Sequence, residues 1–345
     1  MNNLFLTTTL LLTALTSFTQ IPDGYYNSAF NLSGEPLKTA LHNIIDDHIE
    51  YTYSSSNTDV WDILKESDKD TSNAENVILF YSGWSVNASQ EYNSGKGWNR
   101  EHVWAKSRGD FGTTRGAGTD LHNLKPTDIS VNSARNNRWF DEATIQYIDG
   151  DGETNNYISS TRWVWEPRDE VKGDVARIMF YMATRYEGDN NEVDLELIDT
   201  IPSDNNTKAP FFADLSTLLQ WHIQDPVDDF ERNRNEVIFS YQNNRNPFID
   251  HPEYVQLVWG TLLDLYEPEE QKIMCCFPNP THDSIMLYSM EVSLYSIIDS
   301  KGNTVLNNDF KGTIQVDLSS LDKGVYSVVI IGEDGDSNNF KVVKW

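Results

Sequence analysis

The 345-residue sequence predicts an α+β domain followed by a small all-β sandwich. Up to Tyr266, segments with apolar residues at helical spacing alternate with short strand-like runs flanked by Gly, Asn and Asp. From Ile285 onward the chain contains short alternating runs separated by turn pairs such as Lys301-Gly302. We therefore expect a signal peptide at 1–19, a larger domain at 20–267, a charged linker at 268–276 and the sandwich at 277–345.

Helical periodicity is clearest in four segments of the larger domain. Apolar spacing predicts helices at 37–49, 173–186, 211–224 and 225–239, the last with Pro226 near its start. The run from Val77 to Tyr81 predicts a strand, and short apolar runs alternate with turn residues between 76 and 137. This mixture of elements is typical of an α+β domain.

The first residues and the two cysteines indicate export without disulfides. Residues 4–18 carry no charge and are too few and too rich in Thr for a membrane span, so they predict a signal peptide. We find no later segment that could span a bilayer and expect a secreted, extracellular protein. Cys275 and Cys276 are adjacent, which does not suit disulfide geometry.

The distribution of charge points to phosphate. A net charge of −27 argues against a nucleic-acid partner, because carboxylates and phosphates repel each other. Residues 96–140 reverse the sign, since eight Lys and Arg against four Asp and Glu give +4 and leave −31 on the rest. A basic segment on an acidic protein predicts a phosphate site, although a solvated surface can have the same composition.

The basic segment also holds residues suited to phosphodiester hydrolysis. Such hydrolysis needs a water deprotonated near neutral pH, and neutral imidazole suits this task, so His102 is the candidate general base. A hard divalent cation would stabilise the phosphate and the leaving oxygen, with Glu101 and the amide oxygen of Asn132 as ligands. A single carboxylate leaves the ion with positive charge, which attracts phosphate.

A helix opened by Pro126 and Thr127 would place three polar residues on one face. Asn132, Arg135 and Asn136 are spaced at i, i+3 and i+4. Arg135 and Asn136 are therefore candidate substrate-binding residues beside the candidate metal ligand.

The order of Glu101 and His102 sets a condition on the fold. Consecutive residues of a regular strand point to opposite faces, so the strand must end or bend there if both serve one site. The glycine-rich loop that follows permits such a bend.

Motifs across residues 21–266 resemble the bacterial extracellular endonuclease I family of ββα-metal (His-Me finger) nucleases. The matching motifs are Gly24-Tyr25-Tyr26, Asn99-Arg100-Glu101-His102-Val103-Trp104, Gly118-Thr119-Asp120-Leu121-His122-Asn123-Leu124, Val131-Asn132 with Arg135, Gly173 to Arg177, and Asn244 to Pro252. The resemblance implies a ββα-metal domain with surrounding helices, His102 as base, and one Mg²⁺ (or Mn²⁺ or Ca²⁺) held by Glu101 and Asn132. It also implies an endonuclease that cuts DNA, and RNA as well, with little sequence preference; we expect a monomer.

The resemblance further implies a loop arginine that assists the leaving group. Arg115 takes this assignment, with Arg108 and Arg135 as alternatives. The loop between His102 and Asp120 is shorter here than in better-known relatives and has no cysteines.

The C-terminal residues resemble the sorting domain of the type IX secretion system. The matching motifs are Phe277-Pro278-Asn279-Pro280, Leu321 followed by Lys323-Gly324-Val325-Tyr326, and Lys341-Val342-Val343-Lys344. The resemblance implies that this domain engages the type IX secretion machinery and is not part of the enzyme.

Other polar residues and other protein classes receive simpler interpretations. We assign His122 and Asn123 structural roles. We interpret the segment around Asp250 and His251 as a loop whose prolines and aspartate fix turns, in preference to a second cluster of metal ligands. A secreted peptidase or esterase would need a His-Glu-x-x-His or Gly-x-Ser-x-Gly motif, and neither is present. The alternative hypothesis is a non-catalytic surface protein or adhesin with the same sorting tail, which would not need to gather Glu101 and its partners around one cation.

Overall fold

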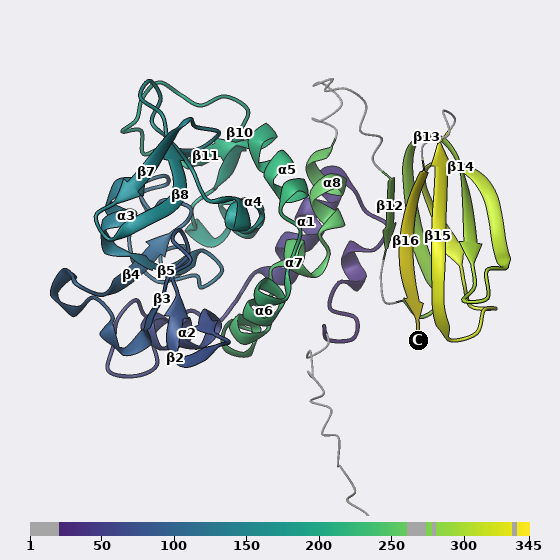
Figure 1. The fold of residues 1–345 in the computed structure, drawn as a ribbon, viewed down its shortest axis with the longest axis horizontal. Helices are drawn as coiled ribbons and strands as arrows, with labels where there is room; N and C mark the ends of the chain where they lie inside the picture. Colours follow the sequence, from purple (N-terminus) through teal and green to yellow (C-terminus); the bar gives the residue numbers. More distant parts are fainter. Residues whose placement is uncertain (1–20, 261–273, 278–280, 333–336) are drawn as a thin grey trace, which may run out of the picture.

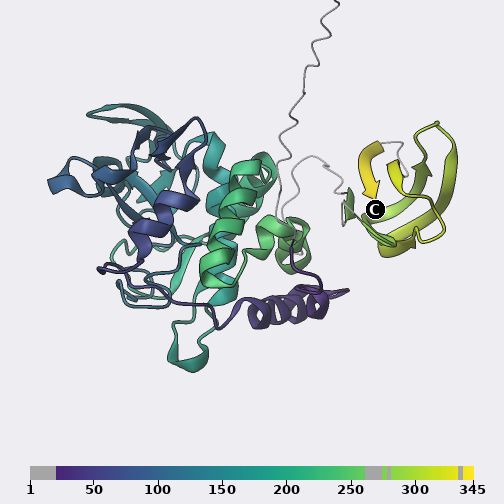
Figure 2. The ribbon, with the colours of Figure 1, turned by 90° about the horizontal axis from the view of Figure 1, so that it is seen from below.

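The computed structural model describes residues 21–260, 274–277, 281–332 and 337–345. Two bodies are visible, a larger one of helices and short strands and a smaller one of strands (Figure 1; Figure 2). The expected signal peptide and most of the expected linker lie outside the described residues. Within the described parts of the chain, no helix is long and apolar enough to cross a membrane.

The larger body mixes helices with short strands, as an α+β domain does. Its α-helices are α1 (Gly34–Ile45), α2 (Val60–Ser67), α3 (Ile129–Arg135), α4 (Lys172–Arg185), α5 (Leu215–Gln224), α6 (Asp229–Gln242), α7 (Pro247–Asp250) and α8 (Glu253–Trp259). Short 3-10 helices occupy Asn27–Ala29, Ala88–Gln90, Asn93–Gly95, Asp169–Val171 and Asp189–Asn191. Its strands are β1 (Lys69–Asp70), β2 (Asn73–Ile78), β3 (Ser85–Asn87), β4 (Trp98–His102), β5 (Leu124–Asp128), β6 (Trp139–Phe140), β7 (Ile145–Asp149), β8 (Gly152–Ile158), β9 (Val164–Glu166), β10 (Glu196–Ile198) and β11 (Phe211–Asp214).

Helix α4 is the centre of this body. Every one of its residues is buried, and it contacts α1, α5 and α7 (Figure 1). The strands form small separate sheets around it: β1-β2-β3, β4-β5, β6-β9-β8-β7 and β10-β11. Five tryptophans, Trp98, Trp104, Trp139, Trp165 and Trp221, are fully buried and belong to the core.

The β4-β5 pair and helix α3 form one consecutive unit. The strands are antiparallel, with Glu101 opposite Lys125 and His102 opposite Leu124, and α3 follows directly and contacts both strands. Strand β4 ends at His102. The strand therefore ends where it must if the adjacent residues Glu101 and His102 are to serve one site.

Helix α3 begins later than its sequence predicts. The prediction that Pro126 and Thr127 open it is wrong, because both lie in β5. The helix begins at Ile129, where the Asp128 carboxylate accepts hydrogen bonds from the backbone N–H groups of residues 130 and 131. Asn136 leaves the helix at a φ of 53°, so it does not continue the helical face.

The other predicted elements exist with shifted ends. The helix expected at 173–186 is α4, and the one expected at 37–49 is α1, which ends at Ile45. The strand expected at 77–81 is β2, which ends at Ile78. The helix expected from 211 is preceded by β11, and the one expected from 225 begins at Asp229 because Asp228 and Glu231 form a capping box there.

The smaller body is all-β, as predicted. Its strands are β12 (Met274–Phe277), β13 (Ser284–Ile298), β14 (Thr304–Asp317), β15 (Gly324–Gly332) and β16 (Ser337–Lys344). Hydrogen bonds join all five into one antiparallel sheet rather than two separate ones. The register of β13 breaks between Ser289 and Ser293, and its first half pairs with β12 and its second half with β15. The sheet encloses its own core, which includes Ile297 and Val328.

Candidate active site

One cavity at the end of β4 contains most of the predicted site. Its volume is about 540 Å³, and Glu101, His102 and Asn132 all line it. Residues from β4, from α3 and from the segment before α2 supply its walls. The structure therefore brings together three residues that lie up to 31 positions apart in sequence (132 − 101).

Glu101 is a buried carboxylate held by two neighbours. Only 3% of the residue is exposed, the Tyr81 hydroxyl donates to its Oε1 at 2.9 Å, and the Arg135 guanidinium lies 3.1 Å from the same oxygen. Burial raises the pKa of Glu101 to about 7, against the opposing effects of Arg135 and Tyr81. The carboxylate is thus poised to bind either a proton or a cation near neutral pH.

Asn132 is oriented by a neighbouring amide. Its Nδ2 donates to Oδ1 of Asn99 at 2.7 Å, so its own Oδ1 is the atom left as an acceptor. Among the described residues no hydrogen bond to that oxygen is present. Asn99 and Glu101 share one face of β4, and Asn132 and Arg135 share one face of α3. The two contacts, Asn132 to Asn99 and Arg135 to Glu101, hold these faces together.

His102 is buried, yet it lines the cavity. Its residue is 5% exposed, and its Nε2 lies 2.9 Å from the carbonyl oxygen of Gly118. A carbonyl can only accept a hydrogen bond, so Nε2 carries the proton and Nδ1 carries the lone pair. Burial lowers the pKa of His102 to about 3, and the hydrogen bond to Gly118 only partly opposes this. The imidazole is therefore neutral at neutral pH, with Nδ1 available as a base.

The predicted arginines occupy different places. Arg135 is fully buried beneath the cavity, where it donates to the backbone carbonyls of His102 and Val103. Arg108 is also fully buried and donates to backbone carbonyls of residues 137, 205 and 207. Arg115 is exposed and lines a separate cavity of about 860 Å³ together with Asp46 and Glu192. Of the predicted substrate-binding residues, Asn136 is exposed at the rim of the first cavity.

Sequence reasoning did not single out three residues that shape the site. Tyr81 holds Glu101, Asn99 holds Asn132, and Lys106 is an exposed cation on the cavity wall. Asn99 could have been found, because it lies two positions before Glu101 on the same strand face. Tyr81 lies in a turn 20 residues upstream, and its sequence carries no signal of this contact.

The residues expected to have structural roles, His122, Asn123 and Asp250, contact the backbone or side chains of neighbouring segments. The His122 ring lies 3.3 Å from the carbonyl of Asn244, and Asn123 exchanges hydrogen bonds with the backbone of Trp104. Asp250 accepts two hydrogen bonds from Arg245, at 2.6 and 2.9 Å. These contacts link the turn before β5 to the segment after β4 and to the segment between α6 and α7.

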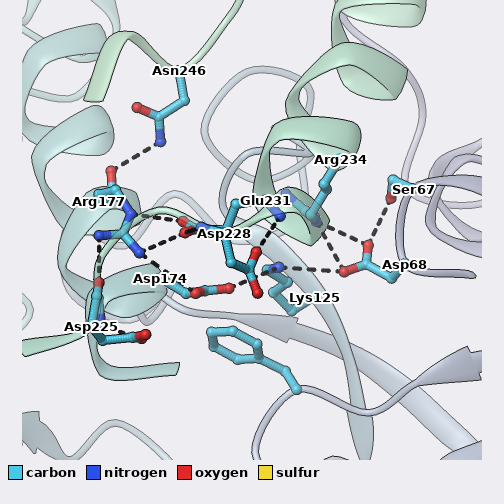
Figure 3. Close-up of polar contacts among 12 residues, drawn as sticks. Ser67, Asp68, Lys125, Asp174, Arg177, Asp225, Asp228, Glu231, Arg234 and Asn246 are labelled. Atoms are coloured by element: carbon cyan, nitrogen blue, oxygen red, sulfur yellow. Dashed lines mark hydrogen bonds and ion pairs between the residues drawn. The ribbon is translucent and has the colours of Figure 1, made fainter. Parts of the chain in front are cut away.

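A second cluster of buried charges adjoins β5 (Figure 3). Lys125, opposite Glu101 in the strand pair, lies 3.4 Å from Asp68 and 3.8 Å from Asp174. Arg177 binds Glu231 through two hydrogen bonds of 2.7 and 2.6 Å. A further arginine, at position 234, binds Asp68 and the carbonyls of residues 121 and 124, so the cluster joins α2, β5, α4 and α6.

Comparisons with known proteins identify the class that this fold and cavity define. The family model described as Endonuclease I matches residues 33–253, and the model described as secretion system C-terminal sorting domain matches residues 275–344. The chain is 52% identical over 240 residues to an extracellular ribonuclease of Bacillus subtilis (strain 168), covering 69% of this chain and 78% of the relative. It is 52% identical over 236 residues to an extracellular ribonuclease of Bacillus amyloliquefaciens, covering 68% and 78%.

A more distant relative carries a different name. The chain is 30% identical over 139 residues to an extracellular deoxyribonuclease of Aeromonas hydrophila, covering 38% of this chain and 48% of the relative. The chain belongs to the endonuclease I family and is a secreted, extracellular nuclease with a C-terminal sorting domain. The alternative hypothesis of a non-catalytic adhesin is not favoured.

Proposed function

We propose that this nuclease hydrolyses internal phosphodiester bonds of both RNA and DNA with little sequence preference, using His102 as general base and one divalent cation held by Glu101 and Asn132. The observation that carries the proposal is the single cavity lined by these three residues, in which Glu101 and Asn132 are each fixed by a neighbouring side chain.

The donor atoms fit a hard divalent cation. Glu101 offers a carboxylate, and Asn132 offers an amide oxygen that its hydrogen bond to Asn99 leaves free. Mg²⁺ binds through one or two carboxylates and otherwise keeps water or substrate phosphate oxygens, whereas a site for a fully protein-bound ion needs more ligands. Among the described residues, no group of three or more His, Cys, Asp or Glu side chains is arranged to hold a metal. One carboxylate and one amide oxygen therefore suit Mg²⁺, with Mn²⁺ or Ca²⁺ as substitutes and with water and phosphate oxygens as the other ligands.

The bound cation would supply Lewis-acid stabilisation of negative charge on the phosphate and the leaving oxygen. The residues of the chain supply the proton transfer. Nδ1 of His102 accepts a proton from the attacking water, while the Gly118 carbonyl holds the other ring nitrogen. Phosphate in the cavity adds negative charge beside the ring and favours the imidazolium that forms, which opposes the lowering of the His102 pKa by burial.

Positive charge for binding phosphate comes from the cavity wall. Lys106 is exposed there, and its charge lowers the pKa of both Glu101 and His102. Arg135 is buried, so we infer that it orients Glu101 and the β4 carbonyls, while Lys106 and Asn136 contact the substrate. Arg115 lines a different cavity, so its assignment to the leaving group stays a prediction.

The local topology and the relatives support the wider proposal. The order β4-β5-α3, with the base at the end of β4 and one metal ligand on α3, is consistent with a ββα-metal unit. Two relatives are named ribonucleases and one a deoxyribonuclease, so we propose activity on both substrates. We further propose that the nuclease domain spans 20–267 and that the domain at 277–345 engages the type IX secretion machinery, with the enzyme acting as a monomer.

A cleavage assay tests this function directly. Purified protein is incubated with supercoiled plasmid and with single-stranded RNA, in Mg²⁺, Mn²⁺ or Ca²⁺ and in excess EDTA. We expect both substrates to be degraded with at least one ion and neither in EDTA. Intact plasmid and intact RNA under all three ions would overturn the proposal, and degradation of only one would restrict it to that substrate.

A further inference from the structure

A stack of flat side chains runs along the wall of the cavity and ends on the imidazole. The Tyr53 ring is stacked on His102, with 5.7 Å between ring centres and 18° between planes. The Arg100 guanidinium carbon lies 3.5 Å from the centre of the Tyr53 ring and 4.1 Å from that of Trp61. All four residues line the cavity.

The geometry points to Tyr53 and Arg100 as positioning residues that hold the His102 imidazole in its reactive orientation, an inference that rests on the proposed role of His102 as base. One hydrogen bond, to the Gly118 carbonyl, fixes a single atom of the ring and leaves its plane free to swing about that contact. The Tyr53 ring restricts this swing, and Phe111, 6.2 Å away at 53°, restricts it further.

Arg100 fixes Tyr53 in turn. Tyr53 belongs to a segment with no helix or strand between α1 and α2. The Arg100 guanidinium donates to the backbone carbonyl of Tyr53 and, at 3.2 Å, to the Ser54 hydroxyl. Arg100 and His102 lie two positions apart on one face of β4, so the strand that carries the base also carries the group that secures its neighbour. A planar guanidinium can hydrogen-bond in its plane and stack on a ring at the same time, which an ammonium cannot do.

This arrangement predicts a loss of rate rather than of substrate binding. A general base must approach the proton it removes to within hydrogen-bond distance, and a misplacement of about 1 Å can lower the rate by about a hundredfold. Neither Tyr53 nor Arg100 needs to contact phosphate for this effect. Ordinary packing would instead lower stability and leave the turnover of the folded enzyme unchanged.

The test compares variants of the full secreted chain in cleavage of an oligonucleotide. We expect Tyr53→Leu and Arg100→Lys to lower kcat by about tenfold or more with KM changed by less than about twofold, and Tyr53→Phe to keep kcat within about twofold. The matched control is Arg138→Lys, which breaks another guanidinium–aromatic stack, 3.6 Å over Trp163, outside the cavity. We expect it to leave kcat unchanged.

A spectroscopic readout separates positioning from folding. The His102 Hε1 proton resonance, assigned by its loss in His102→Ala, should shift in Arg100→Lys, where the Tyr53 ring is still present and only its placement relative to His102 can change, and should stay in place in Tyr53→Phe. An unchanged kcat in Tyr53→Leu, or an unchanged resonance in Arg100→Lys, would overturn the positioning role. Full activity of His102→Ala would instead overturn the proposed base, so the two failures are distinguishable.

Discussion

Two clusters of buried charge share the β4–β5 strand pair, and they differ in how far their charges are neutralised. In the cluster of Figure 3, each of three cations contacts carboxylates directly, as Arg177 does with Glu231. At the cavity, the Glu101 carboxylate is buried with one cation, Arg135, at 3.1 Å, and the nearby amide oxygen of Asn132 accepts no hydrogen bond from a described residue. In the cluster of Figure 3 the paired charges join helices to a strand. At the cavity, oxygens of Glu101 and Asn132 remain that a ligand such as a cation could bind.

The largest effect should come from the base. We expect His102→Ala to lower kcat by about two to four orders of magnitude, the usual contribution of a general base, because no other described side chain at the cavity presents a neutral imidazole. Turnover on plasmid and the thermal unfolding midpoint, measured together, check this. If His102→Ala kept activity close to that of the unchanged protein, His102 would not be the base, and the cavity would be no more catalytic than the cluster of Figure 3.

Opening the closed cluster should reduce stability instead of rate. We expect Arg177→Met to lower the free energy of unfolding by about 3–5 kcal/mol, because it leaves the Glu231 carboxylate buried without its partner. Urea unfolding measures this loss, and kcat of the folded fraction should stay within about twofold. The control is Arg232→Met, which removes an exposed contact to Asp229 and should cost about 1 kcal/mol or less. Equal losses in both variants would contradict the expectation.

Protons should compete with the metal at Glu101. Burial raises the pKa of this carboxylate to about 7, and only the deprotonated form can bind a cation. The apparent Kd for Mg²⁺ should therefore rise by close to tenfold per unit as pH falls below about 7, or up to about a hundredfold by pH 5. Titration calorimetry at several pH values measures it. A Kd that stays constant down to pH 5 would mean that Glu101 has an ordinary pKa or is no ligand.

The amide that orients Asn132 should matter less than the ligand itself. We expect Asn99→Ala to weaken metal affinity or activity by about ten- to a hundredfold, since it frees the Asn132 side chain to rotate. Raising the Mg²⁺ concentration should recover part of the activity. No loss at limiting Mg²⁺ would show that Asn132 needs no such support.

The smallest effect should come from the cavity rim. Lys106→Ala should reduce the slope of log KM against log salt concentration by about one, because one phosphate contact is lost. The control is Lys301→Ala, an exposed lysine of the C-terminal sheet, which should leave the slope unchanged. A slope that is the same in both variants would exclude Lys106 from substrate binding.

Local patterns predicted the parts of the fold that depend on nearby residues. Apolar periodicity located α4, and turn pairs with alternating runs located the C-terminal strands. The sequence placed the start of α3 too early because Pro126 suits both a helix start and a strand. Pro126 lies in β5, where it pairs with Arg100 of β4. The Asp128 side chain then provides the cap.

The site divided in the same way. Glu101, His102 and Asn132 could be identified because all three lie in the basic segment 96–140, and the structure places them at one cavity. The burial of Arg135 beneath that cavity could not be predicted, since helical spacing gives its face but not which element covers it. Tyr81 and Tyr53 reach the site from separate loops, and contacts of this kind depend on tertiary packing.

Binding of Mn²⁺, measured by electron paramagnetic resonance at pH 7.5, tests most directly whether Glu101 and Asn132 hold one cation together. We predict one bound ion per chain in the unchanged protein, loss of that ion in Glu101→Gln and in Asn132→Ala, and its retention in His102→Ala. An unchanged protein that binds no ion, or two ligand variants that bind it as well as the unchanged protein does, would contradict a metal held by residues 101 and 132.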